Sequence, residues 1–425
     1  MKDTTTHNRK VKLKLFPTKK QDADLFELLK HHHQLYNWAL ADRIKTYKEC
    51  GVGLSLSEQQ KINTVIRGRR KTHGLMNANA QSEQVTIKRV DLAFKHFFRR
   101  HKNGESKAGF PRFKPFNRFN GWGYKAHGDG FKVHKGNGKN FNIYLSGVGS
   151  IRARGKARND GGTPKTAEVI HKNGEWFISV TYQYDEVSRS CGTEAIGFDW
   201  GVATYLTVVN HNGEVTEVEN PRYLRKSMAE LADLQRQLAL LPKRKDSRAK
   251  RLLKLKIAKL HQKVANQRLD YAHKSTSKLV DRACMIGTEG LNVKNMTRSA
   301  KGTEEKHGKN VKQKSGLNRE ILNTAPAMTL NLLRYKAEEA GSEYVEAPTK
   351  QIKPSQTCPD CGHQKKKGLG ERQHNCDCGC NIPRDVASSL VCLNWMLGLK
   401  GGDRPRLKRA LTSPSYSETP TKQYV

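Results

Sequence analysis

The chain has 425 residues, and its 78 Lys and Arg against 40 Asp and Glu give a formal charge of +38 at pH 7. At roughly 150 residues per domain, this length predicts two to four domains with a sizeable core. No apolar run approaches the roughly 18 residues of a transmembrane helix, and no apolar segment of a secretory signal follows the basic start. We therefore expect a cytoplasmic, nucleoid-associated prokaryotic protein.

The positive charge is carried along the whole chain. Such a density repels itself unless a polyanion neutralises it, and nucleic acid is the polyanion that gains most from counterion release. A solvated basic surface is one alternative. An anionic membrane is another, which the lack of a strongly amphipathic terminal helix disfavours. The charge therefore favours a nucleic-acid-binding protein.

The residue pattern of the N-terminal half changes twice, from strand-like to helical and back to strand-like. Residues 10–16 alternate basic and apolar side chains, which predicts a strand. Residues 20–105 have helical spacing, and residues 106–192 return to short alternating runs separated by glycine turns. We expect a β-barrel built from residues 1–19 and 106–192, with the helical segment 20–105 inserted into it.

The C-terminal half alternates strands and helices. After a strand that begins near residue 195 comes a hairpin with Asn212 and Gly213 at its turn. The pattern then predicts helices over 221–241 and 246–281, a strand over 283–293, a mobile loop over 300–318, one helix over 318–341, a strand over 343–348 and a last helix over 385–397. This order predicts an α/β domain over 193–356 and 381–400. Residues 401–425 are polar and predict disorder.

Five of the nine cysteines lie between residues 358 and 380. Cys358 and Cys361 have the two-residue gap of a zinc knuckle. Cys376 and Cys378 form a tighter second pair, with Cys380 as the alternative ligand. Disulfides are disfavoured because no secretory signal is present, and a set of unliganded cysteines rarely clusters in this way. The segment 357–380 therefore predicts a structural zinc element.

Three acids follow apolar strands or open a helix. Asp199 and Glu289 stand where predicted strands end, and Asp385 opens the last predicted helix. Three such carboxylates can converge on two Mg²⁺ ions about 4 Å apart, which is the arrangement for phosphodiester hydrolysis. Each acid also has a simpler reading, as a turn residue, a loop acid and a helix N-cap.

Several motifs occur in an order that resembles a known family. They are Gly-Phe-Asp-Trp-Gly-Val at 197–202, Thr-Glu-Gly-Leu-Asn-Val at 288–293, Ser-Gln-Thr-Cys-Pro-Asp-Cys-Gly at 355–362 and Arg-Asp-Val-Ala at 384–387. The chain resembles the RuvC-like nucleases of the TnpB family, insertion-sequence proteins similar to miniature type V CRISPR effectors. Further landmarks are Phe16–Lys19, Tyr36–Trp38, Asn266–Arg268 with His273, and Leu333–Ala337.

This resemblance implies an α+β multidomain fold. It consists of a wedge-like β-barrel with a helical recognition insertion, then an RNase H-like domain with an inserted zinc-binding element. It also implies that Asp199, Glu289 and Asp385 are the metal-binding catalytic acids. A guide RNA from the transposon end would direct cleavage of double-stranded DNA beside a short flanking motif. Pro383, Ser388 and Ser389 depart from the family pattern, as does the tighter second cysteine pair.

Two segments are candidates for nucleic-acid contacts. The helix over 243–268 is rich in Lys and Arg, with Asp246 as its one acid. We expect Lys256, Lys259, Lys263 and Arg268 to form a rail for a guide–target duplex, although a solvated helix face is the alternative. Residues 110–124 interleave six aromatics with Arg112, Lys114 and Arg118, which suits single-stranded RNA. At least half of these aromatics are expected in the barrel core.

Two other sequence features disfavour a histidine metal site and the use of ATP. The consecutive His31, His32 and His33 do not share a helix face, so we expect polar-face or RNA-contacting residues rather than metal ligands. A phosphate-binding loop with a Gly-Lys-Ser/Thr end is missing, which disfavours ATP use.

The sequence thus predicts an RNA-guided, Mg²⁺-dependent DNA endonuclease of a transposon. Alternatives are a miniature CRISPR effector, a transposase, and a nuclease-dead RNA-guided repressor.

Overall fold

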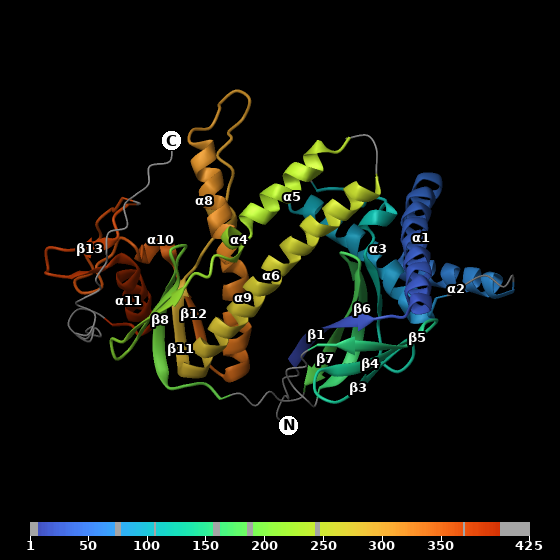
Figure 1. Cartoon of the computed structure of the whole chain (residues 1–425), viewed down its shortest axis with the longest axis horizontal. Coiled ribbons are helices and arrows are strands. Elements are labelled where there is room, and N and C mark those ends of the chain that lie inside the picture. The colour runs from blue at the N-terminus through green and yellow to red at the C-terminus, as the bar shows by residue number, and fades with distance from the viewer. Residues whose placement is uncertain are drawn as a thin grey trace. The chain divides into compact units, whose positions relative to one another are not determined.

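A computed structural model describes residues 7–72, 78–105, 108–155, 162–184, 190–242, 247–368 and 370–399. The chain divides into two compact units, residues 1–186 and 187–425 (Figure 1). Among the described helices, none is long and apolar enough to cross a membrane. The expected disorder of 401–425 and the first residues of the basic helix, 243–246, fall outside the described residues.

The first unit is built on one seven-stranded antiparallel sheet. Its strands are β1 (His7–Phe16), β2 (Gly121–Tyr124), β3 (Phe131–Lys135), β4 (Asn140–Leu145), β5 (Gly149–Arg154), β6 (Thr163–Lys172) and β7 (Glu175–Tyr184). Their order is β2-β6-β7-β1-β5-β4-β3, so β1 joins the two halves of the sheet. The alternating runs therefore predicted β1 and β3 to β7 correctly, whereas β2 was not predicted as a strand.

The predicted barrel is a half-barrel. The strand order ends at β2 and β3, and these two strands are not paired with each other. The chain between them turns back onto β3, where the Gly128 N–H donates to the Phe131 carbonyl oxygen. Because the edges do not meet, the sheet stays open instead of closing into the expected barrel.

Three helices accompany this sheet: α1 (Lys19–Cys50), α2 (Leu56–Thr72) and α3 (Ala80–Lys102). A capping box between Thr18 and Gln21 starts α1, and Gly51 ends it in the left-handed conformation at φ 68°. Leucines of α1, such as Leu25 and Leu28, share one buried core with Leu13 of β1. The helical spacing predicted for 20–105 is thus realised as three helices.

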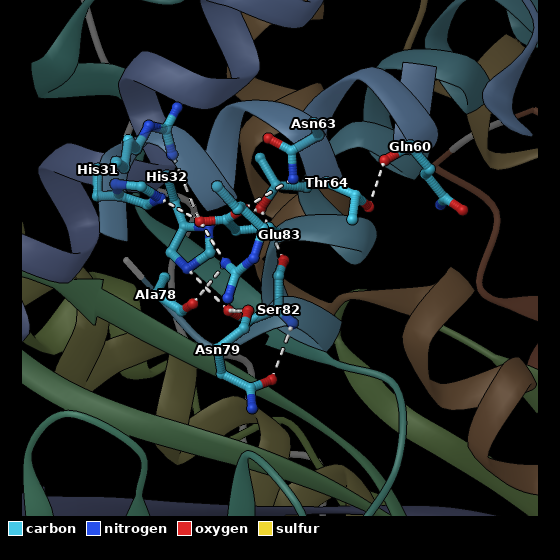
Figure 2. Close-up of polar contacts among 12 residues, drawn as sticks. His31, His32, Gln60, Asn63, Thr64, Ala78, Asn79, Ser82 and Glu83 are labelled. Carbon is cyan, nitrogen blue, oxygen red and sulfur yellow. Dashed lines mark hydrogen bonds and ion pairs between the residues drawn. The ribbon is translucent and has the colours of Figure 1, made fainter. Parts of the chain in front are cut away.

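A buried carboxylate, Glu83, joins these helices (Figure 2). Its side chain is fully buried and accepts hydrogen bonds from His31 and Asn63, both at 2.7 Å. Arg67 and Arg70 form ion pairs with it at 2.8 and 3.6 Å. Burial pulls the pKa of Glu83 upward, but the hydrogen bonds from His31, Asn63 and Arg67 lower it to about 2. The three helices are therefore linked by the buried Glu83 carboxylate, whose charge is balanced by side chains of the protein.

The three histidines of α1 are structural. His31 contacts Glu83, and the His33 ring contacts the Lys114 carbonyl oxygen at 2.7 Å. His32 is fully buried, bonds to Thr86 and stacks on Trp122. The prediction that all three line a polar face is therefore wrong for His32, since the sheet covers that side of α1.

The second unit contains a five-stranded mixed sheet. Its strands are β8 (Glu194–Trp200), β9 (Thr204–Asn210), β10 (Val215–Glu219), β11 (Ala283–Glu289) and β12 (Glu343–Ala347). The order is β10-β9-β8-β11-β12, with β11 parallel to both β8 and β12. The expected hairpin is present as β9 and β10.

Helices surround this sheet. They are α4 (Tyr223–Lys226), α5 (Met228–Leu240), α6 (Arg248–Arg282), α7 (Val293–Met296), α8 (Val311–Thr324), α9 (Pro326–Ala340), α10 (Thr349–Ile352) and α11 (Arg384–Met396). The single helix predicted over 318–341 is two helices, because Ala325 adopts φ 52° and Pro326 starts a new helix. Since α8 begins at Val311, the predicted loop ends earlier than expected.

The cysteine-rich segment has little regular structure. A two-stranded hairpin, β13 (Gln373–Asn375) and β14 (Asn381–Pro383), leads directly into α11. This connection ties the segment to the start of the last helix.

Candidate functional site

The two faces of β8 have different neighbours. Ile196, Phe198 and Trp200 belong to the core that includes side chains of α6 and α9. The residues between them, Gly197 and Asp199, lie on the other face, because side chains alternate along a strand. A Cβ atom at Gly197 would lie 2.3 Å from the Ser389 carbonyl oxygen of α11. Asp199 therefore lies on the face that α11 covers.

Strand β11 repeats this arrangement beside β8. Gly287 is paired with Gly197, and a Cβ atom there would lie 3.2 Å from the Cys392 carbonyl oxygen of α11. Glu289 follows Gly287 by two residues, as Asp199 follows Gly197. The paired glycines let α11 approach the sheet backbone, and the two acids lie on the same face at the same level of the sheet.

Asp385 comes from the first turn of α11. The Ser389 hydroxyl donates to the Asp385 and Thr207 carbonyl oxygens, each at 2.8 Å, which fixes this helix against β9. Val386 and Leu390 pack on Val209 of the same strand. The structure therefore brings Asp385 to the end of the sheet where Asp199 and Glu289 lie.

The pKa shifts reflect this convergence. Burial, followed by the charges of Glu289 and Asp385, raises the pKa of Asp199 well above its usual range. Burial also raises the pKa of Glu289. Carboxylates that oppose one another's ionisation are stabilised when a cation joins them. Taken as whole residues, all three are half-buried.

The acids are gathered less tightly than the thiols. Two groups of at least three His, Cys, Asp or Glu, within the described residues, have ligand atoms within 4.8 Å of one another, and both lie in the cysteine-rich segment. The ligand atoms of Asp199, Glu289 and Asp385 do not all lie within 4.8 Å of one another, so these acids do not form such a group.

Four thiols form the first of these groups: Cys358, Cys361, Cys376 and Cys378. The Sγ atoms of Cys358 and Cys378 are 3.6 Å apart, and those of Cys361 and Cys376 are 3.5 Å apart. Four sulfurs bound tetrahedrally to zinc would be separated by roughly 3.8 Å, given a Zn–S distance of about 2.3 Å. The four cysteines therefore fit one zinc ion, including the tight Cys376–Cys378 pair.

Cys380 belongs to the second group, with Cys358 and His374. The sequence marked Cys380 as an alternative ligand and did not single out His374. His374 pairs with Ile382 in the β13–β14 hairpin, and this pairing, which brings it near the cysteines, could not be predicted from the sequence. The paired glycines of β8 and β11 were also missed, although each precedes an acid by two residues.

The predicted nucleic-acid residues fall into two classes. Lys256, Lys259 and Lys263 are exposed on α6, along the edge of the face that buries Leu260 and Val264. Arg268 instead donates to the Leu322 carbonyl oxygen at 3.0 Å, at the end of α8. The lysines are available to an outside partner, whereas Arg268 is engaged within the protein.

A groove of about 650 Å³ lies in the first unit between α1, α3 and residues 109–118. Its lining includes the predicted Arg112, Lys114 and Arg118 together with Arg89, Arg100 and His96, and it contains no acid. Phe110, Phe113 and Phe116 are exposed, while Phe119, Trp122 and Tyr124 are buried. The prediction that at least half of these aromatics are in the core is confirmed.

Three family models match the chain. One described as "Probable transposase" matches residues 177–300, and one described as "Cas12f1-like, TNB domain" matches residues 327–392. A third, described as "Helix-turn-helix domain", matches residues 7–51, which form β1 and the single helix α1 in this structure.

Full-length relatives agree with these matches. The chain is 31% identical over 371 residues to "Putative RNA-guided DNA endonuclease InsQ" of Escherichia coli (strain K12), covering 86% of each protein. It is 24% identical over 415 residues to a "Putative RNA-guided DNA endonuclease" of Streptomyces pristinaespiralis, covering 96% of this chain and 94% of the relative.

A solved Cas12f1–sgRNA–target DNA complex has the same fold, with a TM-score of 0.59 at 13% identity over 92% of this chain and 99% of that chain. The motifs around the three acids, the family models and the extended similarity to InsQ lead to one assignment. The chain belongs to the TnpB family.

Proposed function

We propose that this protein is an RNA-guided, Mg²⁺-dependent endonuclease of transposon origin that cuts double-stranded DNA beside a short flanking motif. The convergence of Asp199, Glu289 and Asp385 on one end of the mixed sheet carries this proposal. The relatives named as RNA-guided DNA endonucleases support the same activity. One RuvC-like site would cut both strands in turn.

The proposed site works through the placement of its carboxylates. Asp199 and Glu289, on neighbouring parallel strands, would hold ions from the sheet side, and Asp385 would hold them from the helix side. Bound Mg²⁺ would activate the attacking water and stabilise the leaving oxygen. Carboxylate oxygens are suited to this hard cation. Ion binding would also offset the burial and the mutual repulsion that raise the pKa of Asp199.

The remaining segments have proposed roles in the same machine. The half-barrel, 1–19 and 106–192, is the proposed wedge-like domain, and 20–105 is the recognition domain. The nuclease domain would be 193–356 with 381–400. Within 357–380, a zinc ion held by Cys358, Cys361, Cys376 and Cys378 would close a segment that has almost no apolar core.

Two basic surfaces are proposed to bind nucleic acid. The groove with Arg112, Lys114 and Arg118 offers positive charge beside the exposed ring of Phe113, which suits stacked bases of a single strand. Lys256, Lys259 and Lys263 present a row of ammonium groups, which suits a duplex backbone. Both surfaces would read backbone and shape, while base pairing with the guide would read sequence.

The decisive experiment compares Asp199→Ala with the matched variant Asp233→Ala, which changes an exposed acid of α5. Both proteins are purified with their RNA from cells that carry the native locus. We expect Asp199→Ala to bind RNA and target DNA normally but to lose cleavage, because the metal site lacks a central ligand. Asp233→Ala should cleave normally. Cleavage by Asp199→Ala would refute the assignment.

Sequencing the co-purified RNA tests the guide. We expect a single structured species with a fixed part from the transposon end and a variable part. A fixed part from a repeat array would favour a CRISPR effector instead, and heterogeneous RNA would contradict RNA guidance.

A further inference from the structure

The outer face of the half-barrel carries the basic side chains of β1. Leu13 and Leu15 of this strand are buried, whereas Phe16, the next residue, is exposed. The apolar members of the alternating run 10–16 thus face the core, while its basic members and Phe16 face away from it. Because β1 is the fourth of seven strands in the sheet order, these outward side chains lie at the middle of the sheet.

Phe16 begins a row of exposed side chains that crosses four strands. It is paired with Arg152 of β5, and Arg152 is paired with Asn142 of β4. Asn142 is paired in turn with His134 of β3. All four residues are exposed. Directly paired residues project to the same face with Cβ atoms about 5 Å apart, so the row is continuous.

A groove of about 560 Å³ follows this row. Arg154 and Asn140, which are paired with each other in the next row, also line it. None of the described residues that line the groove is acidic. The nearby Glu175 does not line it and is paired with Lys14 at 2.6 Å. The groove therefore has a positive lining with one exposed aromatic ring at its edge.

The two arginines have no protein partner for their charge. Neither guanidinium forms a hydrogen bond or an ion pair within the part of the chain that the structure describes. Arg152 and Arg154 project from the same face of one strand, and an anion between them would relieve their repulsion. A guanidinium matches the geometry of a phosphate, and an exposed ring offers a surface on which a base can stack. Phosphates next to a flat ring are the features of a nucleotide chain.

We propose that this groove binds an unpaired stretch of the RNA that the protein carries, an inference that rests on the proposed function. A base would stack on Phe16, and the adjoining phosphates would bind Arg152 and Arg154. The stretch is unpaired because the bases of a duplex stack on one another and leave no face for the ring. It is a third nucleic-acid surface, separate from the groove beside Phe113 and from the lysines of α6.

The polar members of the row favour RNA over DNA. The side chains of Asn140 and Asn142 each offer a donor and an acceptor, and the His134 imidazole offers both when neutral. The 2′-hydroxyl of RNA is likewise both a donor and an acceptor. These groups lie between the arginines and the outer edge of the sheet, where the sugar of a bound nucleotide would meet them.

The first test probes the RNA inside the full-length complex, purified from cells that carry the native locus. Dimethyl sulfate and 2′-hydroxyl acylation report which bases and sugars are protected. We expect a short protected stretch that becomes reactive in Phe16→Leu, because leucine fills space but cannot stack, and stays protected in Phe16→Tyr. The RNA should dissociate roughly 10-fold faster from Phe16→Leu. Tyr47→Leu, which removes an exposed ring at the end of α1, should resemble the wild type.

The second test measures the salt concentration that releases half of the RNA from the complex. Arg152→Gln and Arg154→Gln should each release it at lower salt, because each loses a phosphate contact. Arg236→Gln, which changes an exposed arginine of α5, should release it at the wild-type concentration.

The outcomes separate this proposal from the proposed function. Wild-type protein that purifies without RNA would overturn both. Bound RNA with the same reactivity in Phe16→Leu, Phe16→Tyr and the wild type would overturn only the binding of RNA in this groove. A change confined to the displaced strand of target DNA, read from the permanganate reactivity of its thymines, would assign the groove to DNA and would also overturn the proposal.

Discussion

The acid centre and the thiol centre of the second unit are built in opposite ways. Asp199 and Glu289 stand on strands whose other face is buried, with Phe198 and Ile286 fully covered. The thiols lie in turns and loops, next to strands of only three residues. A hydrophobic core therefore sets the acid positions before any ion binds, whereas the thiol positions depend on the ion itself. Under the proposed function, metal would have a chemical role in the acid centre and a folding role in the thiol centre.

Removal of zinc should have the largest effect and should separate the two centres. Structural zinc contributes about 10–16 kcal/mol in small zinc domains. A strong chelator, or Cys361→Ser, should unfold residues 357–383 while the five-stranded sheet remains folded. Hydrogen exchange of the backbone amides measures both regions at once.

Cys50→Ser is the control, because Cys50 is exposed at the end of α1. If β8 and β11 lost protection together with the cysteine-rich segment, the two centres would not be independent.

Glu83 gives a third kind of centre, in which a carboxylate is held by protein cations. Glu83→Gln leaves Arg67 and Arg70 without their buried partner and should cost about 3–5 kcal/mol. Thermal or denaturant unfolding measures this loss, and Glu27→Gln, at an exposed position of α1, is the control.

The pH dependence of Glu83 has a defined sign. Its pKa is about 2 in the folded protein and about 4.3 when unfolded, so its stabilisation is present above pH 4 and is lost as the pH falls from about 4 to 2. An unchanged acid-unfolding profile in Glu83→Gln would contradict the role of this carboxylate.

Gly197→Ala tests whether the close approach of α11 builds the acid centre. The new methyl group would meet the Ser389 carbonyl oxygen at 2.3 Å and push α11 off the sheet. We expect a loss of about 1–3 kcal/mol in stability and a fall in cleavage rate on the order of 100-fold, because Asp385 is displaced.

Gly316→Ala is the matched control, since a Cβ atom at that helical position has open space around it. Equal cleavage by the two variants would show that the glycine pair has no part in placing Asp385.

The smallest effect concerns the charge of Asp199 without metal. Because its folded pKa is raised, the metal-free protein should lose stability as the pH rises from the unfolded pKa of about 3.9 through the folded value. Asp199→Asn removes this loss and should raise the metal-free melting temperature at neutral pH by a few degrees.

Added Mg²⁺ should make the wild type melt at a higher temperature than Asp199→Asn, because it stabilises the wild type and not the variant. Melting temperatures across the pH range measure both effects. If melting temperature varied with pH in the same way for both proteins, the neighbours of Asp199 would not raise its pKa in the folded state.

Much of the fold could be predicted from local pattern. Alternation located every strand of the half-barrel except β2, and helical spacing located α1, α3 and α6. The errors lie where backbone conformation overrides pattern, as at Ala325, whose left-handed φ divides one predicted helix into two. The open edge of the half-barrel was also not predictable, since closure depends on which distant strands pair.

The sequence by itself determined the chemistry of this protein: the types of ligand, the acids at the strand ends, the cysteine spacing and the excess of positive charge. These are properties of residues and of short stretches of chain. The tertiary structure decided which of them meet. The register of β8 and β11 aligns Gly197 with Gly287 and so brings the two acids and α11 together. The β13–β14 hairpin places His374 beside Cys358 and Cys380. Such meetings depend on pairings between segments far apart in the chain, which no local pattern encodes.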